Sequence, residues 1–164
     1  ISIVSRGMAL GVTWSLPEED KKLITRSELR DDIAMMLGGR IAEKVFFNEI
    51  TTGALNDLEQ ATKLARDMVT RYGMSDRLGN QIYGRRDELV FLGKELAEHH
   101  KDYSEEIAAK IDAEISSIIT SAYGVAEKII STNKKKLEKV ASVLLDKETI
   151  EAKEFNALMD KTKD

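Results

Sequence analysis

A single proline, Pro17, in 164 residues constrains the fold of this chain more than any other feature of its sequence. Proline interrupts a helix because it lacks an amide hydrogen and its ring clashes with the preceding turn. Proteins contain on average about 5% proline, so a chain this poor in proline favours long uninterrupted helices. Its 42% hydrophobic residues are enough to bury a core. We therefore expect a mainly α fold, a helical bundle with a short β element at the N-terminus.

Apolar residues recur at helical spacing in five segments of the chain. The first follows Thr25 and Glu28, which have the spacing of a capping box, and the second is expected to end at Gly73. The longest begins after Ser104, and a further helix and a short one near residues 152–159 close the chain. Gly38 and Gly39 lie inside the first helix, where each glycine costs roughly 1 kcal/mol relative to alanine. We expect another backbone to pack closely against them.

Residues 1–16 differ from the rest, because they are β-leaning and almost uncharged. Gly7 and Gly11 interrupt this segment, and the acidic turn after Pro17 ends it. The pattern predicts two short strands in an otherwise helical protein.

Composition excludes several classes of function. The net charge of −4 offers no basic patch for nucleic acid. The absence of cysteine excludes disulfides, thiol catalysis and cysteine-bound zinc. The two histidines, His99 and His100, are adjacent, whereas zinc ligands on one helix face need a spacing of four residues. We therefore interpret them as surface residues. From these observations alone the chain is a mostly helical domain without assigned chemistry.

An ordered series of motifs runs along nearly the whole chain. It includes R-G-M-A-L-G-V-T at residues 6–13, L-P-E-E-D at 16–20, L-G-G-R-I-A-E at 37–43, T-T-G-A-L-N-D-L at 51–58 and Y-G-M-S at 72–75. From Ile1 to about Met159, the series resembles the peptidase domain of the FtsH-type, membrane-anchored AAA zinc metalloproteases. The resemblance implies an ATP-driven protease that pulls membrane and unstable soluble proteins through a ring of six identical subunits. This domain would lie on the cytoplasmic side of the membrane, or the organelle equivalent.

In that family two histidines of an H-E-x-x-H helix bind zinc, and the glutamate between them is the general base. The sequence contains no such motif, and the resemblance places that helix upstream of Ile1. The ATPase module, which binds ATP and Mg²⁺, and the transmembrane segments are also expected upstream. We therefore expect this chain to contain no catalytic residue and to be inactive by itself. Within it, residues 1–20 would form a β segment for substrate, 21–103 the zinc-side helices and loop, and 104–164 a C-terminal helical bundle.

The resemblance implies that Asp57 is the third zinc ligand. A catalytic zinc keeps three protein ligands and an open position for water. The sequence alone favours the alternative, in which Asp57 only complements the dipole of the helix that begins there. Glu43 and Asn56 are candidates for residues that surround the ligand without binding the metal. For Glu43 the alternative is an ion pair with Arg40 on the helix surface, and Asn56 is expected to cap the helix.

The resemblance also assigns a role to the strand near the N-terminus. An edge strand presents unpaired backbone groups, to which an extended substrate can pair regardless of its sequence. The alternative is an ordinary strand that covers the helices. The candidate substrate-binding residues are Met8, Ala9, Leu10, Gly11, Val12 and Thr13.

Two other functions stay open at this point. A zinc-free relative would use the same helical domain only to hold an AAA ring together, and a helical adaptor would share ancestry without cleaving peptides. An intact H-E-x-x-H before Ile1, or peptide cleavage by the intact parent, distinguishes the protease from both.

Overall fold

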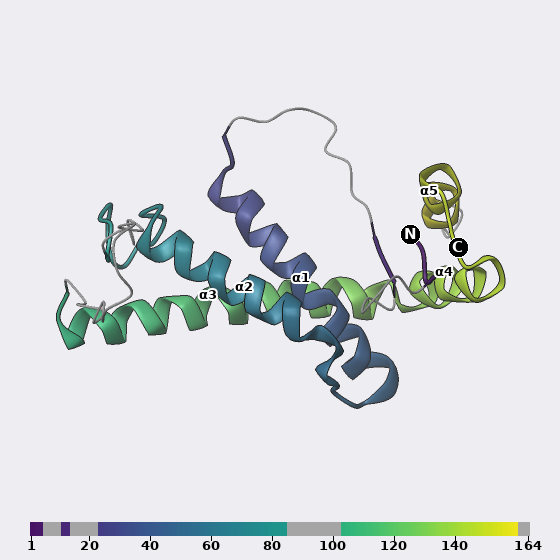
Figure 1. The fold of residues 1–164 in the computed structure, drawn as a ribbon, viewed down its shortest axis with the longest axis horizontal. Helices are drawn as coiled ribbons and strands as arrows, with labels where there is room; N and C mark the ends of the chain where they lie inside the picture. Colours follow the sequence, from purple (N-terminus) through teal and green to yellow (C-terminus); the bar gives the residue numbers. More distant parts are fainter. Residues whose placement is uncertain (5–10, 14–22, 85–102, 161–164) are drawn as a thin grey trace, which may run out of the picture. The chain divides into compact units, whose positions relative to one another are not determined.

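The computed structural model describes residues 1–4, 11–13, 23–84 and 103–160. Most of them belong to helices: α1 (Arg26–Phe47), η1 (Thr52–Ala54, a short 3-10 helix), α2 (Leu55–Thr70), α3 (Glu105–Thr132), α4 (Lys134–Lys147) and α5 (Ala152–Asp160), which Figure 1 labels. The expected mainly α fold is confirmed. No helix within these residues combines the length and apolar character needed to cross a membrane.

Helix α1 begins at the capping box that the sequence predicts. The Thr25 hydroxyl accepts a hydrogen bond from the Glu28 amide at 3.3 Å, and the Glu28 carboxylate accepts from the Thr25 amide at 2.8 Å. A side-chain cap of this kind typically contributes about 1 kcal/mol. The helix ends at Asn48, whose φ of 49° is left-handed and stops the helical hydrogen bonding.

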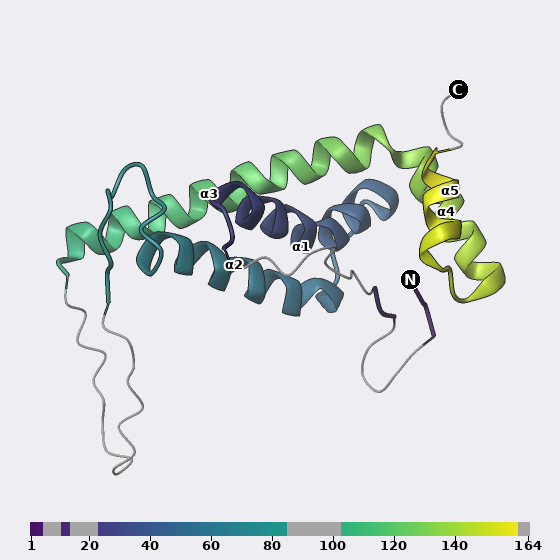
Figure 2. The same ribbon diagram turned by 90° about the horizontal axis from the view of Figure 1, so that it is seen from above.

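Residues 24–127 form one compact unit, built from α1, α2 and most of α3. Figures 1 and 2 show α3 running beside the other two helices. Two ion pairs fix it there, from Arg66 of α2 to Asp112 at 3.9 Å and from Lys44 of α1 to Glu127 at 3.3 Å. The apolar stripes predicted from the sequence supply the buried side chains of this unit: Leu29, Ile33, Leu37, Ile41, Ala61, Ala65, Met68, Val69, Ile111, Ile115, Ile118, Ala122 and Ala126.

Two details of the helices differ from the sequence prediction. A Cβ added at Gly38 or Gly39 would meet nothing within 4 Å among the described residues, so no backbone packs closely there in this part of the chain. Helix α2 ends at Thr70, two residues before the end of its apolar pattern at Tyr72. Tyr72 therefore lies beyond the helix and is 50% exposed. Gly73, with φ of 61°, then turns the chain as expected of a helix stop.

Residues 1–23 and 128–164 form the second unit, of which residues 5–10, 14–22 and 161–164 lie outside the described ranges. Its core consists of Val140, Leu144 and Ile150, against which Ile1 and Phe155 pack. Ser2 forms isolated antiparallel bridges with Val12 and with Thr149. Among the described residues these bridges take the place of the two expected strands, and no longer β element is described. The division at residues 20 and 103 remains a prediction.

A candidate metal ligand and a candidate substrate edge

Asp57 is the third residue of α2 and lies in its first turn. Its side chain is partly exposed, and no hydrogen bond or ion pair holds the carboxylate within the described residues. A negative charge at this position is stabilised by the positive end of the helix dipole, typically by about 0.3–1 kcal/mol. The structure therefore provides a partly exposed carboxylate in the first turn of α2, with which no described side chain pairs.

The turn before α2 determines where Asp57 stands. Thr51 caps η1, because its hydroxyl accepts a hydrogen bond from the Gly53 amide at 3.1 Å. Helix η1 continues directly into α2, whose own capping residue, Ala54, offers no side-chain hydrogen bond. The prediction that Asn56 caps the helix is wrong: Asn56 is the second residue of α2 and is exposed. The short 3-10 turn moves the capping position upstream to Thr51, which apolar spacing alone does not reveal.

Glu43, in the last part of α1, binds Thr51 with both carboxylate oxygens. Oε2 accepts from the Thr51 amide at 3.0 Å, and Oε1 accepts from the Thr51 hydroxyl at 2.6 Å. The hydrogen bond from the Thr51 hydroxyl, and after it the one from the Thr51 amide, lower the pKa of Glu43 below its usual 4.5. The charge of Arg40 makes a smaller contribution in the same direction. The surface ion pair considered for Glu43 does not form. Arg40 instead donates from Nη1 to the Thr51 carbonyl at 3.2 Å.

A carboxylate without a partner is an appropriate oxygen donor for zinc. The described residues contain no group of three histidine, cysteine, aspartate or glutamate side chains that could hold a metal ion. His99 and His100 lie outside the described residues. Asp57 thus fits one ligand position of a zinc site, and the other ligands would have to come from outside the described residues.

Part of the expected substrate strand is described. Gly11, Val12 and Thr13 lie within the described residues, whereas Met8, Ala9 and Leu10 lie outside them. The Val12 amide and carbonyl both pair with Ser2, at 2.8 and 2.9 Å. In an antiparallel pair of this type the two flanking residues direct their amides and carbonyls to the opposite side. No described residue pairs with the backbone of Gly11 or Thr13.

Gly11 lies close to the backbone of Ser2. A Cβ at this position would lie 2.9 Å from the Ser2 carbonyl oxygen. The absent side chain thus makes room for the neighbouring backbone of the chain itself.

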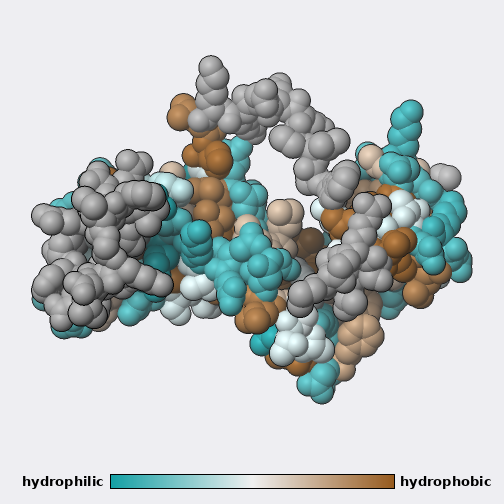
Figure 3. Space-filling model, viewed as in Figure 1, coloured by the Kyte–Doolittle hydropathy of each residue, from teal (hydrophilic) through white to brown (hydrophobic). Residues whose placement is uncertain are grey.

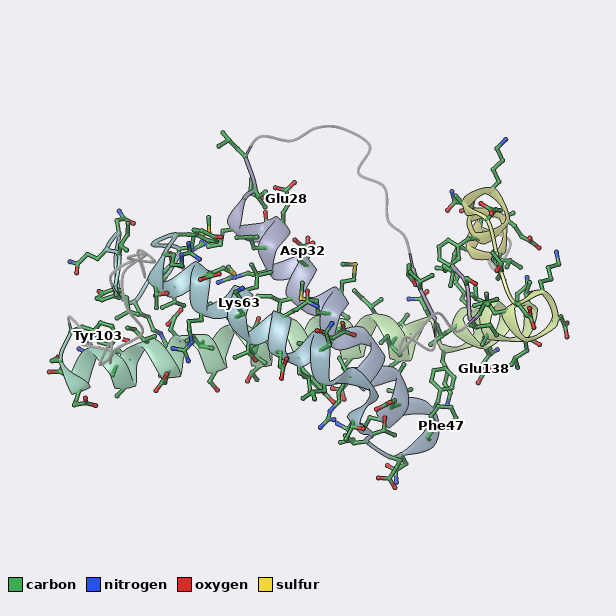
Figure 4. The ribbon with its side chains drawn as sticks, in the orientation of Figure 1. Glu28, Asp32, Phe47, Lys63, Tyr103 and Glu138 are labelled. Carbon is green, nitrogen blue, oxygen red and sulfur yellow. The ribbon has the colours of Figure 1, made fainter. Side chains whose placement is uncertain are left out.

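Several apolar side chains are exposed around α1. Figure 3 shows hydrophobic surface over the start of this helix, where Leu23 and Ile24 are 86% and 57% exposed. At the other end, Phe47 projects from the helix in Figure 4 and is 76% exposed. Leu55, at the start of α2, is 58% exposed. The turn that carries Thr51 is therefore flanked by uncovered apolar side chains.

The model of peptidase family M41 matches residues 1–158 of this chain. The chain belongs to peptidase family M41. Three M41 relatives, each named ATP-dependent zinc metalloprotease FtsH, come from Acidobacterium capsulatum, Rubrobacter xylanophilus and Caldicellulosiruptor bescii. They are 47%, 50% and 50% identical over 97–98% of this chain. The chain spans only 24–26% of the length of these relatives. The resemblance to the FtsH-type peptidase domain is thereby confirmed.

Sequence reasoning missed the role of Thr51 in this M41 chain. The signal was present, because threonine is a preferred helix-capping residue. The contacts from Arg40 and Glu43 could not be found in this way, since Thr51 lies eight positions after Glu43 and beyond the end of α1, outside the pairs three or four residues apart that meet on a helix.

Proposed function

We propose that this chain is the C-terminal part of the peptidase domain of an ATP-dependent, membrane-anchored zinc metalloendopeptidase. Its substrates would be membrane proteins and unstable soluble proteins. A separate module would hydrolyse ATP with Mg²⁺, and six copies would form a ring with this domain on the cytoplasmic side, or the organelle equivalent. The match to family M41 over residues 1–158 carries this proposal, together with the names of the relatives.

In this proposal Asp57 is the third zinc ligand. The two histidines and the general-base glutamate would come from an H-E-x-x-H helix upstream of Ile1. Zinc at such a site lowers the pKa of a bound water to about 7, so that hydroxide is available near neutral pH. Asp57 contributes a carboxylate with which no described side chain pairs.

The edge at Gly11, Val12 and Thr13, which pairs with no described residue on the side away from Ser2, would bind the substrate backbone, together with Met8, Ala9 and Leu10. An extended peptide that pairs with this edge satisfies amides and carbonyls that are otherwise left to water. Recognition through the main chain suits a protease that cleaves many different sequences. Gly11 supports the edge, since any side chain there would push residues 11–13 away from Ser2.

The test is Asp57→Asn in the full-length protein. The two side chains have nearly the same shape, so the fold should be retained, but a neutral amide binds zinc much less well than a carboxylate. Changes next to zinc ligands typically cost about 10–100-fold in affinity or activity, and loss of a ligand should cost at least as much. Zinc content and protein cleavage should fall, while ATP hydrolysis should largely persist.

Asp31→Asn is the matched control, because Asp31 is an exposed carboxylate on α1 with no hydrogen bond among the described residues. Normal cleavage and zinc content in Asp57→Asn would show that another carboxylate is the ligand. Absence of both in the unmodified protein would instead favour a zinc-free assembly domain.

A further inference from the structure

Thr51 has three polar groups, the amide, the hydroxyl and the carbonyl, and each of them forms a hydrogen bond with a side chain of α1. The amide and the hydroxyl donate to the two oxygens of Glu43, at 3.0 and 2.6 Å. The carbonyl accepts from Arg40, at 3.2 Å. Arg40 and Glu43 are three residues apart and therefore lie on the same side of the helix. They form a clamp on a single residue outside it, which we call the Thr51 clamp.

The Thr51 clamp continues into the next turn. The hydroxyl that donates to Glu43 also accepts from the Gly53 amide at 3.1 Å, so one chain of hydrogen bonds runs from Glu43 through Thr51 to Gly53. Space is tight here as well, because a Cβ at Gly53 would lie 3.2 Å from the Thr51 hydroxyl oxygen and 3.5 Å from Glu43 Oε1. The backbone at residues 51–53 is thus held from one side by α1.

This chain of hydrogen bonds contains the side-chain cap of the segment that leads to Asp57. Ala54 gives α2 no side-chain cap, and η1 depends on Thr51 for its cap. In a helix without a cap, the amides of the first turn have no partner within the helix and must form hydrogen bonds with water. Loss of the Thr51 hydroxyl would therefore loosen η1 and the first turn of α2, where Asp57 stands.

We propose that Glu43, acting through Thr51, is a positioning residue that fixes the direction of the Asp57 carboxylate. Glu43 itself does not bind the metal in this proposal, since both of its oxygens are occupied by Thr51. The inference rests on the proposed role of Asp57 as a zinc ligand.

The experiment uses four variants of the full-length protein. Thr51→Val removes the hydroxyl but keeps the shape, and Glu43→Gln leaves one acceptor oxygen where the carboxylate has two. Thr51→Ser keeps the hydroxyl and should rescue the clamp. Asp31→Asn changes an exposed carboxylate on the same helix and is the control. Backbone hydrogen exchange over residues 52–57, measured on zinc-free protein by mass spectrometry, reports on the turn independently of activity.

We expect faster exchange over residues 52–57 in Thr51→Val and Glu43→Gln, and unchanged exchange in Thr51→Ser and Asp31→Asn. Zinc affinity, measured by competition with a chelator, should fall about 10–100-fold in the first two variants, as is typical for residues that orient a zinc ligand. ATP hydrolysis should stay within error of the unmodified protein in all four.

Unchanged exchange in Thr51→Val would overturn the proposal, because the clamp would then not hold the turn. Faster exchange with unchanged zinc affinity would overturn it as well, because the turn would not position the ligand. Asp57→Asn, measured in the same series, separates this failure from failure of the proposed function. If that variant keeps its zinc, Asp57 is no ligand, and the exchange data then describe only the turn.

Discussion

The side chain of Glu114, in α3, is buried in the interior of the unit formed by residues 24–127. The residue is 8% exposed, and within the described residues its Oε2 atom has no hydrogen-bond partner. Arg77, in the loop after α2, brings its Nε atom to 3.6 Å from that oxygen. This distance gives an ion pair but no hydrogen bond. The guanidinium is therefore the main compensation for burying the charge of Glu114.

We expect Arg77→Ala to lower the free energy of unfolding by about 1–3 kcal/mol, because a buried polar group then loses its partner. Adding Glu114→Gln should recover part of this loss, since a neutral amide is cheaper to bury than a charge. Urea unfolding of the single and double variants measures both effects. An unchanged midpoint in Arg77→Ala would mean that the ion pair contributes nothing.

At the scale of single residues, the candidate residues could be named from the sequence, but the contacts that these residues make could not. Asp57 was found through its motif, and its position in the first turn of α2 agrees with the expected helix start. Asn56 was misjudged because η1 shifts the cap upstream. The role of Glu43 beside a metal ligand stays a prediction, and its hydrogen-bond partner is Thr51 and not Arg40. Contacts between a helix and a distant turn depend on how the chain folds back, which local spacing does not encode.

Glycines inside helices are the clearest feature at the scale of elements. Gly39 in α1 and Gly124 in α3 are both exposed, and a Cβ at either would meet nothing within 4 Å among the described residues. Glycine inside a helix costs roughly 0.5–1 kcal/mol relative to alanine, because the unfolded chain loses more freedom. Neither position gains a packing contact in return within the part of the chain that the structure describes.

Gly39→Ala and Gly124→Ala should therefore each stabilise the 164-residue chain by about 0.5–1 kcal/mol in thermal or urea unfolding. The two variants check each other, because both sites have the same helical setting. If Gly124→Ala stabilises the chain and Gly39→Ala destabilises it, a neighbour outside the described residues packs on α1. The expectation of a close backbone contact at Gly38 and Gly39 would then have been right.

The helices themselves could be predicted well from apolar periodicity and capping. Helix α1 begins after Thr25 as the capping box requires, and α3 begins after Ser104, whose hydroxyl accepts from the Ile107 amide at 3.3 Å. The end of α2 was misplaced because Tyr72 continues the apolar pattern past the last helical residue. The two strands were predicted from composition, but the described pairing is limited to single bridges of Ser2. Pairing partners that are far apart in sequence leave no local signal.

At the scale of the whole molecule, several large apolar side chains are exposed among the described residues. Leu23, Phe47 and Leu145 are 86%, 76% and 76% exposed. Single exposed apolar residues are normal on a protein surface, so these residues do not by themselves identify a contact between subunits.

We expect the 164-residue chain alone to be monomeric at low micromolar concentration and to associate only weakly toward six-fold species. It should also bind zinc weakly, because Asp57 is its one proposed ligand and affinity depends on the number of ligands held in place. Light scattering over a concentration series measures the first property, and atomic emission after chelator washing the second. A tight dimer, or one zinc per chain, would contradict this picture.

The pairing of Ser2 with both Val12 and Thr149 links the proposed substrate edge to the order in which the chain is translated. Ser2 lies between Val12 and Thr149, and Thr149 follows Ser2 by 147 residues. At about 5–20 residues per second, a ribosome needs roughly 7–30 s to translate that stretch. Until residues 148–150 emerge, the segment around Ser2 has a neighbour on one side only. The edge that would receive a substrate therefore gains its support only after translation has passed the end of α4.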